Sequence, residues 1–196
     1  MNWVVFDFGG VISRPTAALP ELASIMGAPS PGFADAYWAN RNAYDGGSSD
    51  LEFWQAIATA TGVGEIDAAL SDKLTERDIA GWLELDPATL ELLAELDAAG
   101  APLALLSNAP VSFGRAAEQE DWARHFRELV FSGDLRLIKP GREIFAALTA
   151  RLGAGPGECW FVDDRQDNVD GARAAGLHAA RWTGAGAARS FLAGFL

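Results

Sequence analysis

The stretch that most constrains the fold runs from Asn2 to Ile12, NWVVFDFGGVI. Trp3 to Phe6 is an apolar run of β-branched and aromatic residues, which is typical of a strand buried on both faces of a parallel sheet. Asp7 ends the run, and the paired Gly9 and Gly10 predict a tight turn or a close approach to a ligand. Open α/β sheets bind ligands at the carboxyl ends of their strands. Asp7 therefore either serves such a site or only caps the next turn, and later residues must decide.

The composition limits the class of protein and its partners. The 196 residues, 49% of them hydrophobic and 21% charged, predict a globular protein with one domain and an insertion, or two small domains. No apolar run approaches the roughly 20 residues of a membrane span, and the chain opens directly into the first strand, so we expect a cytoplasmic protein without a membrane partner. A single cysteine, Cys159, excludes an internal disulfide and a cysteine-based metal cluster. The formal charge of −12 argues against nucleic acid as a partner.

The order of helical and strand patterns predicts the architecture. Residues 14–85 carry apolar residues at helical spacing and no convincing strand, which predicts a block of helices. Helices, including one over residues 113–126, then alternate with strands at 102–106, 129–131, 158–162 and 177–182. This alternation predicts an α/β fold, a doubly wound parallel sheet with right-handed crossovers. The predicted domains are a discontinuous core, residues 1–13 and 86–196, and an inserted all-helical domain, residues 14–85.

Polar residues follow three of the predicted strands. They are Asp7, then Ser107 and Asn108, then Asp163 and Asp164. Because parallel strands share one carboxyl edge, these side chains can converge in one crevice, and Lys139, in a loop before a helix, can reach it. Carboxylates with one cation and a hydroxyl suit a phosphoryl site assisted by Mg²⁺, since a divalent ion removes the repulsion between facing carboxylates.

Four segments resemble, in order, the motifs of the haloacid dehalogenase-like (HAD) hydrolase superfamily. They are FDFGGVI with Asp7, LLSNAP with Ser107 and Asn108, LIKPGREIF with Lys139, and FVDDRQDNVDGARAAG with Asp163, Asp164 and Asn168. The helical block occupies the place where many members carry a cap over the site. The resemblance spans nearly the whole predicted core. It implies a Mg²⁺-dependent phosphatase that acts on a small phosphate ester, enclosed by the cap, through an aspartyl-phosphate.

The resemblance also implies roles for single residues. Asp7 would be the nucleophile, which is covalent catalysis by a carboxylate. Ser107 would hydrogen-bond the phosphoryl group, assisted by the adjacent backbone N–H of Asn108. Lys139 would neutralise charge on the nucleophile and on the phosphoryl oxygens and keep Asp7 ionised. Asn168 would orient Lys139 or Asp164.

A metal site follows from the same resemblance. Its ligands would be Asp7, the backbone carbonyl of Gly9 and Asp164. Gly10 would support the turn after the nucleophile. Asp163 would support a ligand, serve as an additional one or only cap the following turn, and these alternatives stay open.

Gly9 departs from the motif, because phosphatases of the superfamily usually carry a second Asp there. That Asp protonates the leaving alcohol and later activates water, and general acid–base catalysis contributes about 10²–10⁴-fold. A good leaving group, such as the hemiacetal of a sugar 1-phosphate, needs less protonation. Alternatively, Asp163, a cap residue or a positioned water supplies the proton, or the chain is a non-catalytic module that binds a phosphorylated ligand or a partner. A 2-haloacid dehalogenase ranks lower, because that branch typically has an aromatic residue at this position.

Five residues of the helical block are candidates for the lining of a substrate pocket: Trp38, Arg41, Tyr44, Phe53 and Trp54. An aromatic stripe at helical spacing is more often core, which is the interpretation favoured for Phe53 and Trp54. Arg41 either meets a distal anionic group of the substrate or, the favoured alternative, is solvated or pairs with acids. The sequence specifies neither the substrate nor the choice between monomer and homodimer.

Overall fold

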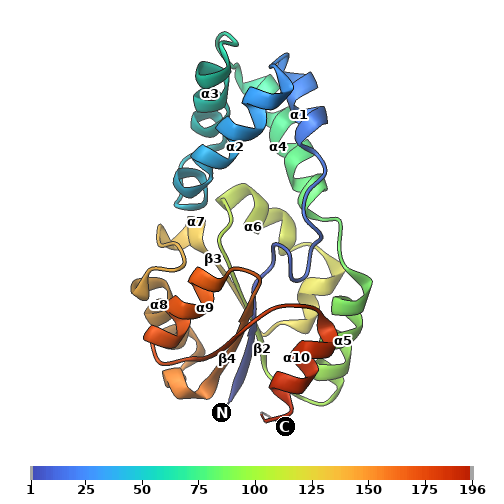
Figure 1. Cartoon of the computed structure of the whole chain (residues 1–196), viewed down its shortest axis with the longest axis vertical. Coiled ribbons are helices and arrows are strands. Elements are labelled where there is room, and N and C mark those ends of the chain that lie inside the picture. Colours follow the sequence, from blue (N-terminus) through green and yellow to red (C-terminus); the bar gives the residue numbers. More distant parts are fainter. Residues whose placement is uncertain (1, 195–196) are drawn as a thin grey trace.

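A five-stranded parallel sheet lies in the lower part of the computed structural model, which describes residues 2–194 (Figure 1). Its strands are β1 (Trp3–Phe6), β2 (Leu103–Ser107), β3 (Glu128–Phe131), β4 (Cys159–Asp163) and β5 (His178–Arg181). They lie in the order β3-β2-β1-β4-β5, and every neighbouring pair is parallel. The predicted α/β class and parallel sheet are confirmed. With β1 in the middle, the carboxyl ends of β1, β2 and β4 lie side by side.

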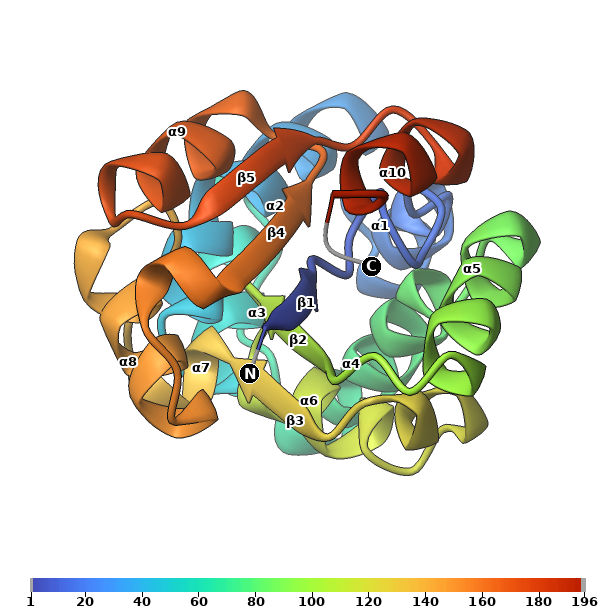
Figure 2. The same cartoon turned by 90° about the horizontal axis from the view of Figure 1, so that it is seen from below.

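Helices pack on both faces of this sheet (Figure 2). One face carries α5 (Pro87–Ala98), α6 (Val111–Ala117) and α10 (Ala185–Leu192), and the other carries α8 (Arg142–Leu152) and α9 (Gln166–Ala174). Alternate strand residues point to opposite faces, so Val4 and Phe6 join one apolar cluster and Val5 joins the other. Because both faces are buried, the strands are continuous apolar runs. Within residues 2–194, no helix has the length and apolar character to cross a membrane.

The helix predicted over residues 113–126 is wrong. Helix α6 ends at Ala117, and a separate 3-10 helix, η1 (Asp121–His125), follows after a turn. In one continuous helix of about 3.6 residues per turn, Phe113 and Trp122 would point in opposite directions. The break lets both rings pack against Phe8, at centroid distances of 4.9 and 5.2 Å. The short helices α7 (Ser132–Leu135) and η2 (Pro156–Glu158), and α10, are absent from the sequence prediction.

A helical block stands above the carboxyl edge of the sheet (Figure 1). It consists of α1 (Leu19–Met26), α2 (Ser30–Asp45), α3 (Asp50–Thr61) and α4 (Ala68–Trp82), and it has its own apolar core, with Trp54 fully buried. The segments that lead into and out of the block pair with each other through an antiparallel bridge between Ser13 and Leu85. The predicted boundaries of an inserted domain lie at this bridge, and the division into domains stays a prediction.

Candidate active site

A cavity of about 490 Å³ lies between the carboxyl edge of the sheet and the helical block. The predicted site residues that line it are Asp7, Gly9, Gly10, Ser107, Asn108, Lys139, Asp164 and Asn168. Asp163 is fully buried and hydrogen-bonded to Lys139. The structure therefore brings together all the residues singled out from the strand ends, while their catalytic and metal-binding roles stay predictions.

Lys139 is the electrostatic centre of the site. Its buried ammonium donates to Asp7 Oδ1 at 2.7 Å, to Asp163 Oδ2 at 2.7 Å and to the Leu106 carbonyl at 2.8 Å, so each of its three N–H groups has an acceptor. Burial disfavours the charge, but the two carboxylates outweigh it and raise the pKa of Lys139. The ammonium is therefore fixed in its charged form beside Asp7.

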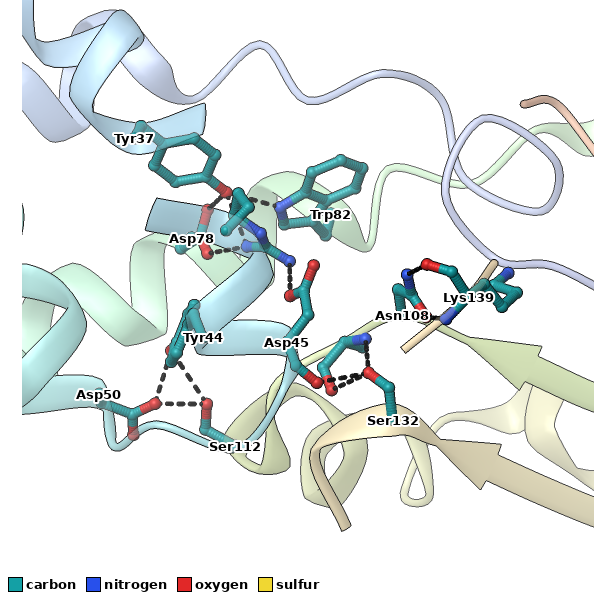
Figure 3. Close-up of polar contacts among 12 residues, drawn as sticks. Tyr37, Tyr44, Asp45, Asp50, Asp78, Trp82, Asn108, Ser112, Ser132 and Lys139 are labelled. Carbon is teal, nitrogen blue, oxygen red and sulfur yellow. Dashed lines mark hydrogen bonds and ion pairs between the residues drawn. The ribbon is translucent and has the colours of Figure 1, made fainter. Parts of the chain in front are cut away.

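Asn108 holds the loop that carries Lys139. The side chain of Asn108 accepts from the Lys139 backbone N–H at 2.8 Å and donates to the Lys139 carbonyl at 3.0 Å (Figure 3). This pair of hydrogen bonds ties the end of β2 to the loop between α7 and α8. The geometry shows Asn108 as a residue that positions Lys139, beside the backbone role expected from the sequence.

Asp7 is buried at the end of β1, with 6% of its surface exposed. Burial raises the pKa of Asp7 to about 7, although the Lys139 ammonium opposes the shift, and the nearby Asp163 carboxylate adds to it. A divalent cation beside this carboxyl would favour its ionised form. A cation held here would therefore oppose the effect of burial on the Asp7 carboxyl.

Asp163 is held by hydrogen bonds on both of its oxygens. Besides the Lys139 ammonium, it accepts from the Arg165 backbone N–H at 2.8 Å and from Asn168 Nδ2, which lies 3.0 Å from each carboxylate oxygen. Asn168 thus reaches Lys139 through Asp163 rather than by direct contact, and its expected role in orienting Lys139 or Asp164 stays a prediction. Because Asp163 is enclosed and saturated, it suits the orientation of Lys139 better than proton transfer to a ligand.

A cluster of three carboxylates is a candidate cation site. Asp7, Asp163 and Asp164 each place one carboxylate oxygen within 4.8 Å of the others, and because both oxygens of Asp163 already accept hydrogen bonds, Asp7 and Asp164 are the candidate ligands. Burial, and then the charge of Asp163, raise the pKa of Asp164, so a cation would relieve an existing repulsion. Gly10, at φ 71°, makes room for this group, because a β-carbon there would come within 2.8 Å of Asp164 Oδ2. Hard oxygen donors of this kind fit Mg²⁺.

A polar cluster on the helical block faces the cavity from above. We call Tyr37, Arg41, Asp45, Asp78 and Trp82 the roof cluster. Arg41 pairs with Asp45 at 2.6 Å and with Asp78 at 3.5 Å, and it donates to the Tyr37 hydroxyl at 3.0 Å. The Tyr37 hydroxyl donates to Asp78 at 2.8 Å and accepts from Trp82 Nε1 at 3.0 Å (Figure 3). Arg41 thus pairs with acids, as favoured from the sequence, but it is buried rather than solvated.

The remaining candidates of the helical block divide between cavity and core. Trp38, Arg41 and Tyr44 line the cavity, whereas Phe53 and Trp54 belong to the core of the block. Sequence reasoning missed Asp45, Asp78 and Trp82, which also line the cavity. The spacing of four residues between Arg41 and Asp45 on one helix is a signal that could have found the first of them.

Two sets of hydrogen bonds fix the end of α2 to the core. Tyr44 Oη donates to Asp50 Oδ1 at 2.5 Å and lies 3.2 Å from Ser112 Oγ, which itself donates to Asp50 at 2.7 Å. Ser132 Oγ, just after β3, donates to the Asp45 carbonyl at 2.5 Å (Figure 3). These contacts hold Asp45 in place over the strand ends.

Known proteins match the chain in sequence and in fold. The phosphoglycolate phosphatase of Escherichia coli K12 is 31% identical over 93 residues, which are 47% of this chain and 37% of that protein. The chain spans less than half of the length of the curated relatives that it matches.

Two solved structures share the fold over most of the chain. The HAD family enzyme BT-2542 of Bacteroides thetaiotaomicron, in complex with magnesium and inorganic phosphate, has a TM-score of 0.71 at 18% identity and covers 94% of this chain and 95% of its own. The L-2-haloacid dehalogenase of Xanthobacter autotrophicus, with chloropropionic acid covalently bound, has a TM-score of 0.74 at 20% identity. Its match covers 99% of this chain and 83% of that chain. The family model described as haloacid dehalogenase-like hydrolase matches residues 1–176. With this match over most of its length, the chain belongs to the haloacid dehalogenase-like hydrolases.

Proposed function

We propose that the protein is a Mg²⁺-dependent phosphomonoester hydrolase that works through an aspartyl-phosphate on Asp7. The observation that carries this proposal is the Lys139 ammonium, which bridges Asp7 and Asp163 at 2.7 Å each beside a third carboxylate, Asp164. A carboxylate held by a fixed cation at the wall of a cavity is suited to nucleophilic attack. The helical block, in this proposal, is the cap that encloses the substrate.

The chain's own residues would carry the two steps of the reaction. An oxygen of Asp7 attacks phosphorus, the bond from phosphorus to the leaving oxygen breaks, and the leaving group departs with that electron pair. Water then attacks phosphorus and gives up a proton to solvent, which balances the proton that the leaving oxygen takes up; the bond to Asp7 breaks, and phosphate leaves with the Asp7 carboxylate restored. Ser107 and the adjacent backbone N–H would bind the phosphoryl oxygens, and Lys139 would offset their charge. Mg²⁺, held by Asp7, Asp164 and the Gly9 carbonyl, would supply further charge neutralisation at the phosphoryl group.

Gly9 limits the substrates that such a site can cleave. It places no acid beside the leaving oxygen, so esters whose leaving group is stable as an anion are favoured. A sugar 1-phosphate is an example, because its leaving group is a hemiacetal. The proposed substrates are therefore small phosphorylated metabolites of this kind.

Two alternatives are weaker. A non-catalytic module that binds a phosphorylated ligand or partner would explain Gly9, but such a module has no need for the buried set of Asp7, Lys139 and Asp163. The likeness to a haloacid dehalogenase is one of fold alone, at 20% identity. The carboxylates of Asp7, Asp163 and Asp164 within 4.8 Å of one another favour chemistry that uses a cation.

The test is phosphate release from a panel of phosphomonoesters by wild type and by Asp7→Asn, with Mg²⁺ and with a chelator. Asp121→Asn is the matched control, because its side chain is 99% exposed. We expect turnover that requires both Mg²⁺ and Asp7 and that is unchanged in the control. Equal rates in wild type and Asp7→Asn would rule out the proposed nucleophile. Phosphate binding without any turnover would favour the binding module.

A further inference from the structure

The roof cluster has no spare positive charge for a ligand. The Arg41 guanidinium donates to Asp45, lies 3.5 Å from Asp78 and donates to the Tyr37 hydroxyl. One cation opposite two carboxylates leaves a formal charge of −1 on this side of the cavity when both are ionised; burial raises the pKa of both Asp45 and Asp78, and the charge of Arg41 opposes the shift. A buried arginine in a cavity often binds an anionic ligand, but the guanidinium of Arg41 is already paired with Asp45 and Asp78.

Aromatic rings fix Arg41 in this paired state. Its guanidinium lies 5.4 to 6.0 Å from the ring centroids of Tyr37, Tyr44, Phe53 and Trp82. The Arg41 side chain is only 10% exposed. Release of Arg41 toward a substrate would break its ion pairs inside an apolar cage and leave Asp45 and Asp78 uncompensated, which is costly.

The two carboxylates keep capacity to accept hydrogen bonds. An ionised carboxylate has about four acceptor positions, and Asp45 and Asp78 both line the cavity. Trp82 and Trp38, the latter 51% exposed, present aromatic surface to the same space. Hydroxyl donors together with apolar C–H faces complement such a wall, whereas a second anionic group meets repulsion.

We propose that the group esterified to phosphate is uncharged and rich in hydroxyls, as in a hexose monophosphate, and that Asp45 and Asp78 select it. The inference rests on the proposed phosphatase function and names its substrate class. Both carboxylates accept hydrogen bonds from the hydroxyls, and both disfavour ligands with a carboxylate. Phosphoglycolate, whose leaving group carries a carboxylate, is thereby a poor substrate, in contrast to what the name of the Escherichia coli relative says of that protein.

The sharpest test compares glucose 1-phosphate with glucuronic acid 1-phosphate, which differ only in a hydroxymethyl group and a carboxylate. We expect wild type to favour glucose 1-phosphate, the ester with the uncharged leaving group, by about tenfold or more in kcat/KM. Asp45→Asn and Asp78→Asn, which keep the side-chain shape, should narrow this ratio, mainly through a lower KM for the charged ester. Asp72→Asn removes the same charge from an exposed position on α4 and should leave the ratio unchanged.

Equal or reversed preference in wild type overturns the inference and leaves the phosphatase proposal standing. If neither ester is cleaved, binding of both to Asp7→Asn in Mg²⁺, measured by calorimetry, separates the two ideas. Tighter binding of glucose 1-phosphate supports the selection by Asp45 and Asp78 although the proposed activity fails. Equal binding of the two esters overturns that selection. Where Asp7→Asn does not fold, wild type in a chelator gives the same comparison.

Discussion

The indole of Trp82 lies against Gly9, so that a β-carbon on Gly9 would come within 3.3 Å of the ring carbon Cζ3. The ring is also held from its other side, because Nε1 donates to the Tyr37 hydroxyl at 3.0 Å. A side chain at position 9 would therefore press against an anchored ring of the helical block, which would have to shift by a few tenths of an ångström to admit it.

Gly9→Asp alone should not create an efficient general acid, because the new side chain meets the Trp82 ring. We expect the single variant to melt at a lower temperature and to gain no activity on alkyl phosphates. Gly9→Asp combined with Trp82→Ala opens the space and should raise that activity by about tenfold or more over Trp82→Ala alone. Rates on a panel of alkyl phosphates measure the effect. A large gain from Gly9→Asp by itself would show that the ring is not the obstacle.

Lys139→Met should destabilise the protein by about 3–5 kcal/mol at pH 8, because it leaves Asp7 and Asp163 buried without their cation. The loss should be smaller at pH 5. Burial already places the pKa of Asp7 at about 7, and without the ammonium the carboxyl would be protonated at still higher pH. Urea unfolding at the two pH values checks this. A loss that is independent of pH would mean that packing of the Lys139 stem, rather than its charge, stabilises the site.

Mg²⁺ should stabilise the folded chain through Asp164. At one hundred times the dissociation constant the gain in the free energy of unfolding is about 2.7 kcal/mol. Asp164→Asn should weaken Mg²⁺ binding by about tenfold or more, whereas Asp167→Asn, exposed three residues later, should not. The melting temperature, measured as a function of Mg²⁺ concentration, gives the stabilisation by Mg²⁺ and its apparent dissociation constant for each variant. Equal Mg²⁺ dependence in the two variants would remove Asp164 from the ligand set.

The preference for a neutral ester should strengthen as the pH rises through about 6. Burial raises the pKa of Asp45 to about 6, although Arg41 opposes the shift, and the nearby Asp78 and Lys139 charges act in opposite directions. Below this pH Asp45 is neutral and repels an anionic ligand less. The ratio of kcat/KM for glucose 1-phosphate over glucuronic acid 1-phosphate should therefore rise by about threefold to tenfold between pH 5 and pH 7. The phosphate groups of both esters titrate alike, so their effect cancels.

Asp45→Asn should abolish the rise in this kcat/KM ratio between pH 5 and pH 7. Stability offers a second reading, because the folded pKa of Asp45 lies above the ordinary value of 3.8. The contribution of Asp45 to the free energy of unfolding then falls between about pH 4 and pH 6 and is constant above that range. A ratio that keeps its full pH dependence in Asp45→Asn would assign the titration to another group.

Local patterns were enough to predict the sheet and the residues at its edge. Trp3 to Phe6 and Cys159 to Val162 are apolar runs that end at Asp7 and Asp163, and the parallel topology alone then brings these carboxylates together. The connection from Asn168 to Lys139 through Asp163 was not predicted, because it depends on which of the two adjacent carboxylates the end of β4 turns inward.

Contacts between distant segments were beyond the sequence. Asp78 meets Arg41 only because the helical block brings these side chains of α4 and α2 within 3.5 Å of each other, which no spacing along the chain reveals. The break after α6 similarly depends on Phe8, whose ring contacts both Phe113 and Trp122. Helical periodicity indicated that the segment is helical but not where tertiary packing interrupts it.

The bridge between Ser13 and Leu85 is continued by two backbone hydrogen bonds of 2.8 Å, from Arg14 to Glu84 and from Asp86 to Ile12. The chain therefore enters and leaves the helical block at two neighbouring points, and this does not depend on how many residues the block contains. Helices of the block can be lengthened, shortened or exchanged without a change in the distance between the two segments that join it to the sheet. Under the proposed function, the strand-end residues that would carry the reaction and the roof cluster that would select the leaving group lie on separate stretches of sequence, so a different roof would leave the strand ends beneath it as they are.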